Sequence, residues 1–207
     1  MCRGVRVRKL TLREGEELVH AARNAIELAL KSPIAKKTVI YESLKDFDWP
    51  SGAFVTLSHY PLGALRGCVG FPRPSTTLGR AVVDSAISAA FDDPRFVSVS
   101  FSELTELIIE VSVLSELEPM PGTEKEKLKS VKIGKDGLMI EYGIYSGLLL
   151  PIVAVEEKWS PEEFLDAVCE KAGIPKDYWK QKNVKLYKFT TQVFKEEEPM
   201  GRVAEIK

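Results

Sequence analysis

Residues 65–70 carry the clearest capacity for chemistry in this chain, in the order Leu-Arg-Gly-Cys-Val-Gly. Cys68 offers a nucleophilic or redox-active thiol, and Arg66 stands two positions before it. Because side chains two apart on a regular strand project from the same face, we expect the guanidinium of Arg66 to lie beside the thiol. It would favour the thiolate, lower the thiol pKa below the free value of about 8.5, and hold a carboxylate or phosphate. The spacing therefore predicts Cys68 as nucleophile and Arg66 as stabiliser of the thiolate or of a bound anion.

The two glycines around Cys68 need a physical reason of their own, because glycine weakens a strand. Gly67 and Gly70 indicate a bulge, a sharp bend or the close approach of a ligand to the backbone, so both are candidate substrate-binding residues. On this interpretation Cys68 and Arg66 open into a cleft between a sheet and a helix. The alternative is a packing role, because an unpaired cysteine often behaves as a small buried apolar residue.

Four polar residues further along the chain are weaker candidates for binding a substrate. Asp93 and Arg95 flank a proline at the expected end of a helix, where they either line a site or stop the helix and pair locally. Glu110 and Ser112 alternate with apolar residues on an expected strand, so they share one face. That face lies toward either solvent or a polar pocket, and the pattern is compatible with both.

The histidines and cysteines are too few and too dispersed for a metal centre or a disulfide framework. The cysteines are Cys2, Cys68 and Cys169, without a CxxC pair, and the histidines are His20 and His59. We therefore expect no metal and no cofactor. His59 is also a poor base for Cys68, because a regular hairpin places it about 13 Å along the strand from the residue opposite the cysteine.

The composition is that of an intracellular globular protein without an electrostatic preference for its partner. The 207 residues include 29 basic and 30 acidic side chains, and the net charge of −1 indicates neither nucleic acid nor an anionic membrane. The longest apolar run, Gly147 to Val155, is too short to cross a bilayer and contains Pro151. No apolar segment follows the basic N-terminus, so we expect no secretory signal and a cytoplasmic location. Asn and Gln are scarce while Lys and Glu abound, as in many thermophile proteins.

Hydrophobic periodicity predicts the elements that position these residues. A helix of about 18 residues follows a capping box at Thr11–Glu14, and a hairpin spans 53–58 and 64–69. Further helices are expected at 78–90, capped by Ser75 or Thr76, and at 161–172, and further strands at 107–115, 131–133, 137–142, 147–150 and 184–194. The grouping favours an α+β fold with a mostly antiparallel sheet flanked by helices. Residues 1–207 form one domain with a core at about 10–196, and 197–207 form a polar, frayed tail.

The hexapeptide at residues 65–70 resembles the signature of the AMME syndrome candidate gene 1 family. The resemblance extends over roughly residues 10–196, at positions 52–57, 89–90, 93–96, 103–104, 109–114, 137–138, 149–151, 159 and 171–173. So many matches in order make it far more specific than a lone motif. One position departs: Ile152 follows Leu149-Leu150-Pro151 where the family often has Gln, so this chain lacks that polar group.

The resemblance implies an α/β architecture with a larger and a smaller subdomain, and it implies no particular reaction. It also suggests partners, because some prokaryotic members occur with Memo-type and radical-SAM proteins. Two hypotheses for function follow. The first is a thiol-dependent enzyme that uses Cys68 and Arg66 on a small or anionic substrate. The second is a non-catalytic binding module for a protein or RNA partner, in which Cys68 is unreactive.

Overall fold

The computed structural model describes residues 8–31 and 38–206, so Cys2 and the basic residues among the first seven lie outside the described residues. The fold is α+β with antiparallel sheets, as predicted. Contacts divide the chain into a larger unit, Met1–Leu114 with Gln192–Lys207, and a smaller unit, Ser115–Thr191. Among the described helices, none combines the length and the apolar content that spanning a bilayer requires.

The larger unit is built on a five-stranded sheet in the order β2-β1-β3-β8-β9. Its strands are β1 Ala53–His59, β2 Ala64–Phe71, β3 Leu107–Leu114, β8 Thr191–Glu196 and β9 Val203–Ile206. The predicted β1–β2 hairpin is present, and β1 also pairs antiparallel with β3. β1 and β3 are therefore central strands, whereas β2 forms one edge of the sheet.

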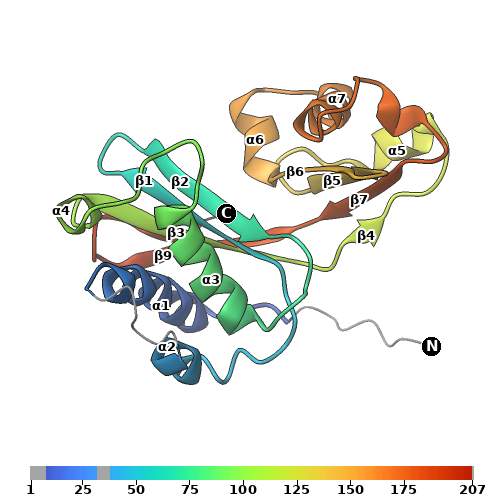
Figure 1. The fold of residues 1–207 in the computed structure, drawn as a ribbon. Helices are drawn as coiled ribbons and strands as arrows, with labels where there is room; N and C mark the ends of the chain where they lie inside the picture. Colours follow the sequence, from blue (N-terminus) through green and yellow to red (C-terminus); the bar gives the residue numbers. More distant parts are fainter. Residues whose placement is uncertain (1–7, 32–37, 207) are drawn as a thin grey trace. The chain divides into compact units, whose positions relative to one another are not determined.

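Helices cover one face of this sheet (Figure 1). They are α1 Leu12–Lys31 and α3 Leu78–Phe91, with the short α2 Thr38–Ser43 and α4 Phe101–Leu104 beside them. Alternate residues of the central strands, among them Val55, Leu57 and Ile109, are fully buried in the core that these helices share. The capping box at Thr11 starts α1 as predicted, whereas α3 begins after Thr77, just beyond the expected Ser75 or Thr76.

A buried ion pair ties α1 to the sheet. Arg23 donates from Nε and Nη2 to the two carboxylate oxygens of Glu196 at 2.7 and 2.5 Å, and also to the carbonyl oxygens of Leu104 and Leu107. Glu196 in turn accepts the backbone N–H of Ile109 at 2.8 Å. The carboxylate is thus satisfied by a guanidinium and an amide, which offsets the cost of burying the two charges.

The smaller unit lies in the chain between β3 and β8, which are neighbours in the larger sheet. Its first and next-to-last residues are joined: Ser115 N–H donates to the carbonyl of Thr190 at 2.8 Å, and Thr190 N–H donates to Ser115 Oγ at 2.9 Å. Its four-stranded sheet has the order β4-β7-β5-β6. The elements are β4 Glu118–Pro119, β5 Gly137–Tyr142, β6 Tyr145–Leu149, β7 Lys185–Phe189, α5 Glu124–Ser130, α6 Pro151–Glu156, α7 Pro161–Lys171 and the 3₁₀ turn Tyr178–Lys180.

One helix of the smaller unit matches its prediction closely. Ser160 caps α7 through a capping box with Glu163, and Pro161 occupies the first turn. Cys169 is fully buried and Ala172 nearly so. α7 thereby supplies much of this unit's core, together with Trp179.

Three expectations about the chain's later segments are wrong. The segment 184–194 is two strands, β7 and β8, which belong to different sheets. Residues 131–133 form no strand, and the charged residues before them form α5. The predicted polar tail at 197–207 contains β9, which pairs with β8 because Val203 finds a buried site in the core. Backbone pairing with β8 and the buried side chain of Val203 therefore hold this segment in the larger unit.

Candidate functional site

A β-bulge at Arg66 determines how the site is arranged. Leu57 pairs with Gly67, but the next residue, Ser58, pairs with Leu65, so Arg66 is left without a partner on β1. An extra residue breaks the alternation of side chains between the two faces of a strand. The residue opposite Cys68 is consequently Thr56 and not Val55, and the spacing of two no longer places Arg66 beside Cys68.

Arg66 belongs to a separate ion pair. Its Nε donates to Glu103 Oε1 at 2.5 Å, and its Nη2 donates to Glu103 Oε2 at 3.1 Å and to the carbonyl of Val97 at 2.7 Å. The guanidinium is buried, lies 5.7 Å from the ring centroid of Phe96, and holds the pKa of Glu103 below its usual value. Arg66 therefore ties β2 to the segment 96–104. These contacts do not support the predicted role of Arg66 as stabiliser of the Cys68 thiolate.

The glycines around Cys68 are explained by packing. A Cβ at Gly67 would lie 2.2 Å from the carbonyl oxygen of Ala89, so α3 approaches β2 closely at this point. A Cβ at Gly70 would lie 2.3 Å from the ring of Phe54, which leans across from β1. The carbonyl oxygen of Ala89 and the ring of Phe54 thus occupy the space beside these two glycines, where the sequence predicted a bound substrate.

Asp93 and Arg95 form a clip on the outer edge of β2. Asp93 Oδ2 accepts the backbone N–H of Cys68 at 2.9 Å, and Arg95 Nη2 donates to the carbonyl of Cys68 at 3.4 Å. The two side chains also bond each other at 2.7 and 2.9 Å, which holds the pKa of Asp93 well below its usual range. Because an edge strand exposes unpaired backbone groups, this clip fills the place of a sixth strand beside Cys68.

Cys68 lies on the sheet face opposite α1 and α3, contrary to the expected cleft between sheet and helix. It shares a row across the strands with Thr56 on β1 and Glu110 on β3, and the carboxylate of Glu110 lies 3.6 Å from the ammonium of Lys195 on β8. The adjacent row holds Gly70, Phe54 and Ser112. We call these residues the Cys68 face: Phe54, Thr56, Cys68, Gly70, Glu110, Ser112 and Lys195.

The thiol of Cys68 is poorly activated. Burial raises its pKa, and the carboxylates of Glu110 and Asp93 act in the same direction. A hydrogen bond from Thr56 Oγ1, 3.4 Å from Sγ, and the positive charge of Arg95 oppose that effect without reversing it. The direction is opposite to the one predicted from Arg66, and the group is a neutral thiol at neutral pH.

His59 takes no part in the row. Its Nε2 lies 3.7 Å from Glu103 Oε1, so it joins the Arg66–Glu103 pair at the end of β1. The expectation that His59 would not contact Cys68 therefore agrees with its observed partner.

No cluster of three or more His, Cys, Asp or Glu side chains suited to a metal ion occurs within residues 8–31 and 38–206.

Sequence reasoning missed two members of the row, Thr56 and Lys195. Thr56 stands between apolar neighbours in the 53–58 strand, but a regular hairpin without the bulge places Val55 opposite Cys68, and so gives no signal that Thr56 lies beside the thiol. Lys195 lay one residue beyond the expected end of the last strand. Glu103, the partner of Arg66, had no signal apart from its place in the family resemblance.

Comparison with known proteins identifies relatives across nearly the whole chain. The sequence model of the AMMECR1 family matches residues 19–194. The protein PF1979 of Pyrococcus furiosus is 46% identical over 193 residues, 91% of each chain, and MJ0810 of Methanocaldococcus jannaschii is 46% identical over 203 residues, 97% of this chain and 99% of that one. The crystal structure titled as the uncharacterized protein PH0010 of Pyrococcus horikoshii superposes with a TM-score of 0.86 at 44% identity, covering 94% of this chain and 97% of that chain.

Proposed function

The chain belongs to the AMMECR1 family, and on that premise, together with the geometry around Cys68, we propose that it is a non-catalytic binding module for a partner protein. The partner binds the Cys68 face of the larger unit. The observation that carries the proposal is the combination of a neutral thiol with two guanidinium groups that are already paired, Arg66 with Glu103 and Arg95 with Asp93.

A thiol enzyme needs a thiolate close to neutral pH, and that requires an available positive charge or a base. Arg66 donates to other acceptors, and His59 lies beside Glu103. Among the described residues, Arg95 is the guanidinium that lowers the thiol pKa, and burial outweighs its effect. These contacts favour a thiol that packs against a partner over one that attacks a substrate.

The Cys68 face has the properties of a recognition surface. Cys68, Thr56, Phe54 and Gly70 are all half-buried, so each offers part of its surface to a contacting molecule. The hydroxyl of Thr56 and the Glu110–Lys195 pair supply hydrogen-bonding groups, and the ring of Phe54 supplies an apolar contact. A central apolar contact among polar groups is typical of protein interfaces.

The charge on this face favours a protein over RNA. Glu110 lies beside Lys195, so the row carries charges of both signs, and the whole chain has a net charge of −1. Phosphate backbones call for a basic patch, which this face lacks among its described residues. By family resemblance, the first partners to test are the Memo-type and radical-SAM proteins of the same organism.

The binding proposal is tested with charge-reversal and steric variants of the face. Purified wild-type protein should bind one of the two candidate partners in calorimetry, and Glu110→Arg and Thr56→Arg should each weaken binding by at least about tenfold, which is typical for disruption of a central contact. Glu17→Arg on the exposed side of α1 is the matched control and should bind as the wild type does. Cys68→Ser should retain binding, because the proposal gives the thiol no chemical role.

A second test covers the case in which neither candidate binds. A photo-crosslinking amino acid is placed at Thr56 in one variant and at Glu17 in another, and both are irradiated in extract of the source organism. A protein captured at Thr56 alone is then purified and titrated against the same charge-reversal series. Equal capture at both positions, or no effect of Glu110→Arg on the purified partner, would remove the Cys68 face as the binding surface.

A thiol-dependent enzyme remains the second candidate because of one contact. Arg95 reaches the carbonyl of Cys68, and its charge together with the hydrogen bond from Thr56 favours the thiolate. If an anionic substrate displaced Asp93 from Arg95, the thiol would lose a carboxylate from its surroundings. Arg95, and not Arg66, is then the residue that binds the anion.

A further inference from the structure

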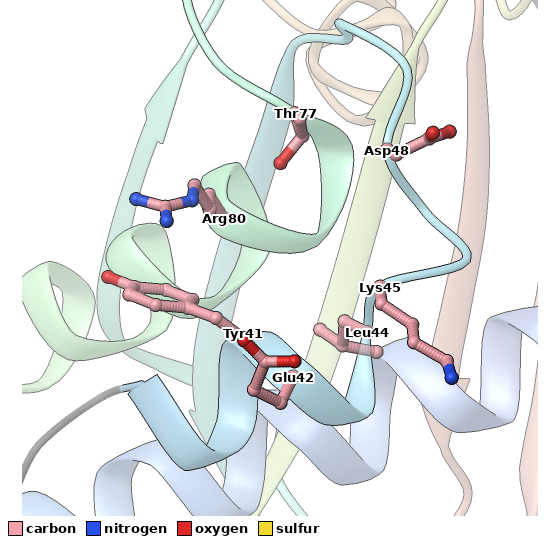
Figure 2. Close-up of a pocket in the computed structure, with 7 residues that line it drawn as sticks. All are labelled: Tyr41, Glu42, Leu44, Lys45, Asp48, Thr77 and Arg80. Atoms are coloured by element: carbon pink, nitrogen blue, oxygen red, sulfur yellow. The ribbon is translucent and has the colours of Figure 1, made fainter.

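A pocket separate from the Cys68 face lies between α2 and α3 in the larger unit (Figure 2). Its volume is about 140 Å³, close to that of five water molecules at roughly 30 Å³ each. Seven residues line it: Tyr41, Glu42, Leu44, Lys45, Asp48, Thr77 and Arg80. The size suits a small polar molecule and is too small for a nucleotide or a peptide.

One wall of the pocket is held rigidly. Leu44 is buried, and a Cβ at Gly79 would lie 2.8 Å from Leu44 Cβ, so α2 and α3 are in close contact beside the pocket. Tyr41 donates its hydroxyl to Asp84 Oδ1 at 2.8 Å, and the guanidinium of Arg80 lies 4.7 Å from the centre of the Tyr41 ring. These contacts orient Tyr41 and Arg80 without any ligand.

The pocket gathers charges of both signs that do not neutralise one another. Glu42 and Asp48 are acidic and Lys45 and Arg80 are basic, and among the described residues no salt bridge joins one of these four side chains to another. Figure 2 shows Arg80 with Tyr41 on one side, Lys45 and Asp48 on the other, and Glu42 at the lower rim. A ligand that carries only one charge would be attracted by two of these groups and repelled by the other two.

The hydroxyl of Thr77 adds a polar group directed into the pocket. Thr77 precedes the first residue of α3, a position where threonine usually accepts a backbone N–H of the helix, but here its side chain makes no such bond. In Figure 2 its oxygen points toward the space between Arg80 and Leu44. Thr77 can therefore donate to a carboxylate that is bound by Arg80.

We propose that this pocket binds a small zwitterion of the α-amino acid class, with its carboxylate on Arg80 and Thr77 and its ammonium group on Glu42. The two charges of such a ligand are carried on one small molecule, so it presents a carboxylate to the basic group and an ammonium to the acidic group. Leu44 and the ring of Tyr41 contact a short apolar side chain. The three polar partners are exposed or half-buried, so the binding is weak and reversible.

The experiment compares alanine with its two halves. Amide spectra of the ¹⁵N-labelled full chain are recorded during titration with L-alanine, with propionate, which lacks the ammonium group, and with ethylammonium, which lacks the carboxylate. We expect alanine to shift amides of α2 and of the start of α3 and to bind at least about tenfold more tightly than either half, as expected for one lost charged hydrogen bond.

Matched variants separate this site from general surface binding. Arg80→Gln and Glu42→Gln should each weaken alanine binding by about tenfold. Arg13→Gln and Glu17→Gln, the same changes on the exposed side of α1, should leave it unaltered. Equal affinity for propionate and alanine, loss of binding in the α1 controls, or no shift at α2 and α3 up to about 10 mM alanine would each overturn the proposal.

Discussion

The carboxylate of Asp93 accepts the backbone N–H of Cys68 at 2.9 Å, so the residue at the centre of the signature hexapeptide is held by a side chain from beyond α3. Asp93 is itself buried and paired with Arg95. The backbone of Cys68 is therefore fixed on both sides, by β1 and by this clip.

Replacing Asp93 should destabilise the fold. Asp93→Ala leaves the N–H of Cys68 and the guanidinium of Arg95 without their acceptor, and we expect the free energy of unfolding to fall by about 2 kcal/mol. Urea denaturation at neutral pH measures this change. Asp92→Ala is the control, since the carboxylate of Asp92 lies next to Asp93 in the chain but is exposed, and among the described residues its side chain bonds only Ser88. Equal stability of the Asp93 variant and the wild type would contradict the role of the clip.

The same carboxylate should give the protein a characteristic acid sensitivity. The pKa of Asp93 is held below its usual range, so its stabilisation is complete above about pH 4, the ordinary aspartate pKa, and is lost as the pH falls further. The stability of the wild type should therefore decline more steeply below about pH 4 than that of Asp93→Ala, and the two curves should converge. Unfolding curves at a series of acidic pH values provide the comparison, and parallel curves would be inconsistent with a depressed pKa.

The thiol of Cys68 should react slowly at neutral pH and with an apparent pKa above the free value. Iodoacetamide rates across pH measure it in a Cys2→Ser chain, since Cys169 is fully buried with a pKa raised to about 11. Arg95→Met should raise the apparent pKa of Cys68 further, because Arg95 favours the thiolate. Arg66→Met should leave it unaltered in the folded protein. A pKa below about 8.5 would favour the enzyme over the binding module.

Gly67 should tolerate no side chain. The Cβ of Gly67→Ala would lie 2.2 Å from the carbonyl oxygen of Ala89, so α3 has to move away from β2, and we expect a loss of about 3 kcal/mol. Thermal and urea denaturation test this, with Leu65→Ala on the same strand as the exposed control. A variant with wild-type stability would show that α3 approaches β2 less closely than described.

The last strand should be required for full stability. A chain that ends at Glu197 loses β9 and the buried side chain of Val203, and it should melt at a lower temperature than the full chain. Val203→Ala in the full chain should cost about 2 kcal/mol through the lost apolar contacts. Ala204→Ser, a small change at a neighbouring half-buried position, is the control. An unchanged melting temperature after truncation would restore the frayed tail that the sequence predicted.

Local patterns gave the elements of the fold correctly where a cap or a strict period was present. Thr11 marked a helix start through a capping box that the structure contains, and hydrophobic periodicity placed a helix at 161–172, where the structure has α7. The β1–β2 hairpin followed from alternation and a turn rich in proline and glycine. The division of 184–194 into two strands could not be predicted, because the break at Thr190 separates two sheets that are formed by residues distant in the sequence.

The sequence predicts part of the arrangement around Cys68. The part that it misses, the position of Arg66, has one physical origin. Cys68, Glu110 and Ser112 do lie on one sheet face, and Asp93 and Arg95 do contact the cysteine through its backbone. The bulge at Arg66 inserts one residue, and that shift redirects the guanidinium to Glu103. Nothing in the order of residues 65–70 distinguishes a bulge from the ligand-binding bend that the glycines also allow.

The paired hydrogen bonds between Ser115 and Thr190 have a consequence for how this architecture can vary. They close the smaller unit at its stem, so the 75 residues or so between them begin and end at nearly the same point in space. Length and content can change within that loop while β3 and β8 keep their places as neighbours in the larger sheet. The smaller unit is thus a segment that evolution, or a protein engineer, can exchange for another without rewriting the sheet that carries Cys68.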